Sequence, residues 1–81
     1  MFPVRSILST KKAATAYQQA IDSGLADEAA EASFNLGLLR QEQGRRDEAA
    51  VAYQRAVDSG VAEPAARAAA QLALLRKAGG R

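Results

Sequence analysis

The sequence predicts an all-α fold made of antiparallel helical hairpins in an α-solenoid, with four main helices. The first observation is an internal repeat: residues 9–45 match residues 45–81 at an offset of 36, and 19 of the 37 aligned positions are identical. Self-similarity at a fixed period is typical of repeat arrays. The second observation is that apolar residues recur at spacings of three and four in each half, which is the period of an α-helix.

The chain opens with a segment that lies outside the repeat. Residues 1–8 share nothing with the residues that they would match one repeat later, and Pro3 disfavours a helix there because it lacks a backbone N–H. We expect this segment to be irregular, either as a short cap over an apolar face or as a frayed terminus. The first helix is then expected over residues 10–23, with Ser9 or Thr10 as its N-cap.

The repeat domain, residues 9–81, is expected to contain three further helices, over residues 27–43, 46–59 and 63–78. Asp27 can cap the second helix, and a proline is tolerated in the first turn of the last one. Glycines that can take the left-handed conformation end the helices, and the short connections make neighbouring helices antiparallel. The expected apolar stripes are Ala13, Ala16, Tyr17, Ala20 and Ile21; Ala29, Ala32, Leu36 and Leu39; Ala49, Ala52, Tyr53, Ala56 and Val57; and Ala65, Ala68, Ala69, Leu72 and Leu75.

Small residues are expected where helix backbones approach one another. Alanines recur in the stripes of the first and third helices, and Gly37 has Ala73 as its counterpart one repeat later. The two tyrosines at equivalent positions, Tyr17 and Tyr53, are expected to fill the larger gaps between hairpins. Helices of this length are marginal alone, so packing against neighbours must hold them.

Composition and charge argue against several classes of function. The 81-residue chain has a formal net charge of +2 with the two signs mixed, which does not indicate a nucleic-acid partner. It contains no histidine and no cysteine, so Ser–His and Cys–His catalysis are impossible, and no Gly-rich phosphate loop is present. We therefore expect no enzyme activity, no cofactor and no metal site.

The hydrophobic segments do not predict contact with a membrane. The apolar runs are far shorter than the roughly 20 residues that cross a bilayer, and the first residues do not resemble a signal peptide. A cytoplasmic protein is therefore expected.

The repeat resembles the tetratricopeptide repeat (TPR), a helix–turn–helix unit, and the resemblance covers residues 9–81. It departs from the family in its 36-residue length, against the usual 34, and in Ser33 and Ala69, which stand where tryptophan is common. A repeat of the Sel1 kind is the nearest rival assignment. The matching motif, in order and spacing, is Asn35-Leu36-Gly37, Gly44, Asp47-Glu48-Ala49, Tyr53 and Ala56.

The resemblance implies that a peptide or protein segment binds on a concave face lined by the first helix of each repeat. Phe34 and Leu38 stand where some family members hold a carboxylate-binding Lys and Asn, so that clamp is absent here. Alternatively, these two residues pack against a neighbouring helix or a second copy. The expected binding residues, carried over by position, are Glu31, Phe34, Asn35, Leu38, Gln41, Glu42, Arg67, Ala70, Gln71, Leu74 and Lys77.

An array of two units leaves both of its ends open, whereas about three units are needed for stability. We expect Leu72, Leu74 and Leu75 to leave apolar surface exposed, and Leu72 and Leu75 to support self-association, with a dimer as the favoured homo-oligomer. The alternative is a purely structural self-assembly unit, or a fragment of a longer repeat array, with no separate ligand.

Overall fold

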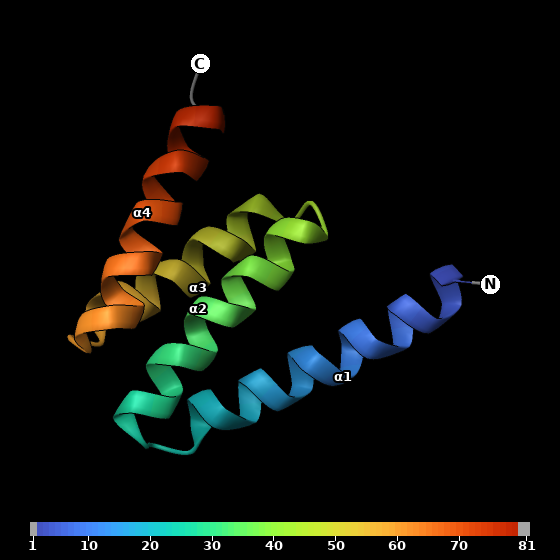
Figure 1. The fold of residues 1–81 in the computed structure, drawn as a ribbon, viewed down its shortest axis with the longest axis horizontal. Helices are drawn as coiled ribbons and strands as arrows, with labels where there is room; N and C mark the ends of the chain where they lie inside the picture. The colour runs from blue at the N-terminus through green and yellow to red at the C-terminus, as the bar shows by residue number, and fades with distance from the viewer. Residues whose placement is uncertain (1, 80–81) are drawn as a thin grey trace.

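The computed structural model describes the backbone of residues 2–79 and the side chains of residues 11–78. Over this part of the chain the regular structure is entirely helical, without strands, which confirms the expected all-α class and the number of helices. None of the described helices has the length and hydrophobicity needed to cross a membrane. The helices are α1 (Phe2–Asp22), α2 (Ala26–Glu42), α3 (Arg46–Asp58) and α4 (Ala62–Gly79) (Figure 1).

Helix α1 is longer than expected at its start. It begins at Phe2, which corrects the prediction that residues 1–8 are irregular; Met1 lies outside the described residues. Pro3 falls in the first helical turn, where its missing N–H would have had no partner within the helix and its fixed φ suits the helix. The expected N-caps, Ser9 and Thr10, therefore lie inside α1.

The helix ends follow the glycines. Gly24, Gly44 and Gly60 have φ values of 85°, 79° and 77°, the left-handed conformation that the sequence predicted after the first three helices. The expected cap of α2 is wrong, because Leu25 occupies the N-cap position without a side-chain hydrogen bond. Asp27 lies instead within the first turn, where the helix dipole favours its charge.

Serine side chains close the two equivalent turns in the same way. Ser23 Oγ donates to the Ala20 carbonyl oxygen over 2.7 Å and accepts from the Leu25 N–H over 3.2 Å. Ser59 repeats both bonds with its own neighbours, over 2.6 and 3.1 Å. The internal repeat therefore extends from the sequence to the hydrogen bonds of its turns.

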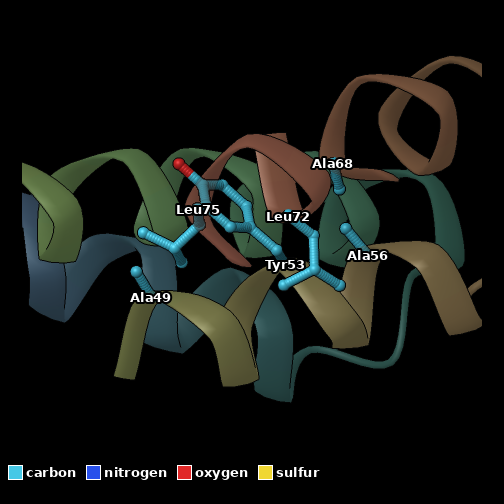
Figure 2. Packing of buried hydrophobic residues seen from close by; sticks show 6 residues of the cluster. All are labelled: Ala49, Tyr53, Ala56, Ala68, Leu72 and Leu75. Atoms are coloured by element: carbon cyan, nitrogen blue, oxygen red, sulfur yellow. The ribbon is translucent and has the colours of Figure 1, made fainter. Parts of the chain in front are cut away.

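The hydrophobic core lies between α3 and α4, and α2 packs against both of these helices. Tyr53 is fully buried, with an exposed fraction of 0%. Phe34 and Leu38 of α2 pack against this core from the side. Among the described residues, α1 contacts α2 alone. The side chains that converge in the core are Ala49, Tyr53, Ala56, Ala68, Leu72 and Leu75 (Figure 2).

Gly37 of α2 and Tyr53 of α3 lie in close contact where these two helices pack together. A methyl group added at Gly37 would overlap the Tyr53 ring, so the helices approach as closely as the sequence predicted for its small residues. The ring lies 6.0 Å from the Phe34 ring, centroid to centroid. The Tyr53 hydroxyl donates to Gln41 Oε1 over 2.6 Å. Its counterpart Tyr17 is only half-buried.

Helix α2 is buried on more than the single predicted stripe. Ala32 and Leu36 of that stripe are buried, and so are Ala30, Ser33 and Gly37, which lie beside it. The reason is that α2 contacts all three other helices, whereas a stripe model assumes one covering neighbour.

Candidate functional site

The predicted binding residues lie on two helices that contact one another, α2 and α4. On α2, the charged and amide side chains of Glu31, Gln41 and Glu42 are exposed, while Phe34, Asn35 and Leu38 are half-buried. Of the predicted binding residues on α4, only Gln71 is half-buried. The exposed members on α4 are Arg67, Ala70, Leu74 and Lys77.

Three of the predicted binding residues have structural partners within the chain. Phe34 and Leu38 pack against the α3–α4 core, so packing against a neighbouring helix, the alternative for these residues, accounts for part of their surface. Gln41 accepts the hydrogen bond of the buried Tyr53 hydroxyl. Burial raises the pKa of this hydroxyl, and the negative charge of Glu42 raises it further.

The expected exposure of Leu72 and Leu75 is wrong. Their exposed fractions are 5% and 7%, because both face α3 and lie in the core. Residues three apart on a helix share one face, so a single neighbouring helix can cover both. Leu74 points elsewhere and is 58% exposed, as expected. Neither Leu72 nor Leu75 is therefore accessible for self-association in this fold.

The starts of α2 and α4 enclose an open hollow of about 400 Å³. Four carboxylates line it: Asp27, Glu28 and Glu31 from α2, and Glu63 from α4. Its remaining wall is apolar and consists of Val61, Ala62 and Pro64. Glu63 Oε1 also lies 3.8 Å from Nη2 of the Arg67 guanidinium.

This acidic hollow is suited to a cationic group. The two helix N-termini stabilise nearby carboxylates but offset only part of their charge, and the apolar wall can accept the alkyl stem of a lysine or arginine. In the described part of the chain, no three acidic side chains are grouped closely enough to hold a metal ion. A positively charged side chain of another molecule is therefore the ligand chemistry that fits.

Of the four acidic residues around this hollow, the sequence predicts only Glu31 as a binding residue. The missed signal is the repeat itself, since Asp27 and Glu63 occupy equivalent positions one period apart and each lies in the first turn of its helix. Two equivalent helices that pack side by side bring such positions together. The contact between α2 and α4 is what makes Asp27 and Glu63 neighbours.

Opposite charges lie at the other end of α4. Arg76 and Lys77 are exposed in its last turn, where the helix dipole favours cations. The outer surface of this helix therefore changes from acidic at its start to basic at its end, with the exposed Leu74 near the basic end. A ligand that follows the helix meets charges of both signs.

Comparisons with known proteins found no match. No family model fits the chain, and no curated protein and no solved structure is similar to it at a significant level. Membership of the TPR family therefore stays a prediction from the sequence motif, and the structure supports its coarser part, a four-helix all-α fold.

Proposed function

We propose that the chain is a non-catalytic protein–protein interaction module of TPR type, which binds a peptide or protein segment along α2 and α4. The observation that carries this proposal is the acidic hollow between the starts of these two helices. It is open, it has an apolar wall, and it lies on the helices whose residues the resemblance assigns to ligand binding. A concave site with a few polar groups is the usual form of a binding site.

The charges and the exposed leucine define the segment that fits. A lysine or arginine occupies the acidic hollow, and an apolar residue contacts Leu74. Glu63 and Leu74 are eleven residues apart on α4, about 16 Å along the axis at 1.5 Å per residue. About five residues of extended chain span this distance at about 3.3 Å each. The ligand class is therefore a segment with a basic residue and an apolar residue about five positions apart.

The alternative is a structural self-assembly unit, or a fragment of a longer array, without a separate ligand. Its proposed interface has lost its support, because Leu72 and Leu75 belong to the core of the single chain. Self-association through other surfaces stays a prediction. Light scattering after size exclusion, over a wide concentration range, tests it directly.

The binding proposal is tested with peptides that carry one basic and one apolar anchor at separations of three to eight residues. Fluorescence anisotropy with the full chain measures their affinity, and a separation near five residues is expected to bind best. The double variant Asp27→Asn with Glu63→Gln is expected to weaken binding about tenfold, because two exposed charge pairs contribute up to about 1 kcal/mol each. This loss should shrink at high salt.

A matched control removes two carboxylates outside the hollow. Asp47 starts α3 as Asp27 starts α2, and Asp58 is exposed at the end of α3. The double variant Asp47→Asn with Asp58→Asn should leave peptide affinity unchanged. If the control and the hollow variant lose affinity equally, or if no peptide of the series binds, the proposal is wrong.

A further inference from the structure

Helices α1 and α3 are equivalent in the repeat, but they are covered differently. Ala52 of α3 is buried, with an exposed fraction of 4%, whereas its counterpart Ala16 on α1 is exposed. Tyr53 is fully buried and Tyr17 is only half-buried. Figure 1 shows α1 at the edge of the molecule with α2 alone beside it.

The uncovered side of α1 forms a hollow of about 290 Å³. We call its exposed residues Lys12, Thr15, Ala16 and Gln19 the α1 open face; Lys11 also lines the hollow. One repeat later, these four positions are Glu48, Val51, Ala52 and Arg55, which line a second hollow together with Leu36 and Arg40 of α2 and Gln18 of α1. Of these four α3 residues only Ala52 is buried, whereas Ala16 at the same position of α1 is exposed, so the two surfaces differ in the burial of this alanine.

The α2–α3 junction shows what a covering helix supplies. Gly37 admits the Tyr53 ring, since a methyl group there would overlap it. Arg40 Nε lies 3.3 Å from Glu48 Oε1, and the arginine side chain is only 23% exposed. The covering helix thus contributes a residue without a side chain and, three positions later, a charge opposite to that of the facing residue.

In the first unit, the requirement for a very small residue facing the tyrosine is the same, but the required charge of the facing residue is reversed. Tyr17 stands in the place of Tyr53 and again needs a very small facing residue. Lys12 stands in the place of Glu48, so the facing charge must be negative instead of positive. A positive residue at that point would face a like charge.

We propose that the α1 open face binds an acidic amphipathic helix of a partner protein. The partner helix carries a glycine against Tyr17 and, three residues further on, an aspartate or glutamate opposite Lys12. It runs antiparallel to α1, as α2 runs antiparallel to α3. This surface is separate from the α2–α4 face proposed above, so either proposal can fail alone.

A second copy of the chain does not offer a glycine facing Tyr17 and an acidic residue facing Lys12. Its uncovered helix is α4, on which Ala66, Ala69 and Ala73 are exposed where Ala30, Ser33 and Gly37 of α2 are buried. If α4 covered α1 of another copy in the same way, the Ala73 methyl group would overlap the Tyr17 ring. Arg76 would also face Lys12. Head-to-tail stacking is therefore disfavoured at two positions.

The test uses a labelled peptide with the sequence of residues 26–42, in its native form and with Arg40→Glu. Fluorescence anisotropy with the full chain measures both affinities. The Arg40→Glu peptide is expected to bind about tenfold more tightly, because its carboxylate faces Lys12 where the native arginine repels it. Replacing its glycine, Gly37→Leu, should abolish binding to the α1 open face.

Charge reversal on the chain supplies the decisive comparison. The variant Lys12→Glu should invert the preference, so that the native peptide binds better. Arg46→Glu changes the net charge equally at an exposed site on α3 and should leave the preference unchanged. Equal affinities of the two peptides, or a preference that ignores Lys12→Glu, would overturn the proposal. The mass of the chain in solution, measured without peptide, shows whether a second copy binds the α1 open face. If the chain self-associates and Ala16→Arg abolishes this association, a second copy is the occupant and the proposal of a partner helix is wrong.

Discussion

Replacing Gly37 by alanine tests the packing of α2 on α3 against the intrinsic preference of the helix. Alanine is favoured over glycine by about 1 kcal/mol in a helix interior. The added methyl group, however, overlaps the ring of Tyr53, and overpacking a core costs about 1–3 kcal/mol. The ring cannot easily move, because it is fully buried, lies 6.0 Å from the Phe34 ring and is held by a 2.6 Å hydrogen bond to Gln41. The cost should therefore lie near the upper limit, which leaves a net loss of about 2 kcal/mol.

Urea unfolding followed by circular dichroism measures this loss. For a protein of this size, with a slope of about 1 kcal/mol per molar urea, the midpoint should fall by about 2 M. The reciprocal variant Ala73→Gly, at the equivalent exposed position, should lose only the helix preference, about 1 kcal/mol. In a Tyr53→Leu background the same Gly37→Ala change should become neutral or stabilising. A higher midpoint for Gly37→Ala in the otherwise native chain would refute the close contact of these two residues.

Two further predictions concern the core. Burial raises the pKa of Tyr53 above its ordinary value of 10.0. The stability that the protonated hydroxyl contributes is therefore fully present below about pH 10 and is lost as the pH rises through the folded-state pKa. Urea unfolding from pH 8 to 11 should show this decline in stability, and the decline should disappear in Tyr53→Phe but persist in Tyr17→Phe. Leu75→Ala should lower the free energy of unfolding by about 2–5 kcal/mol, whereas Leu74→Ala should change it by less than about 0.5 kcal/mol; similar effects of the two variants in thermal or urea unfolding would contradict the assignment of Leu75 to the core and Leu74 to the surface.

The internal repeat is the feature of the sequence that predicts most of the fold. The helical period and the three glycines located the helix ends to within one or two residues wherever a second copy of the pattern was available. Residues 1–8 have no second copy, and Pro3 by itself disfavours a helix there. Proline is compatible with a helix in its first turn, so its effect depends on where the helix begins, and periodicity does not determine that point.

The candidate site was harder to predict, because periodicity defines a face but does not say which neighbour covers it. The repeat pattern predicts exposed Leu72 and Leu75 at an open end only if no helix except a following one can bury them. In the structure the preceding helix, α3, covers both. The acidic hollow was missed for a related reason: it combines Glu63 with residues of α2 that are distant in sequence, and only the contact between α2 and α4 makes them neighbours.

The weak coverage of α1 has a consequence for how the molecule moves. None of its described side chains, residues 11–22, is buried, and it contacts only α2. Local opening of a segment costs little when few apolar contacts are broken, so we expect α1 to detach and return more readily than the helices around Tyr53. A helix that binds the α1 open face would then also hold α1 in place. Part of its binding free energy would be spent on ordering α1, and the observed affinity would depend on how often α1 is docked in the free chain.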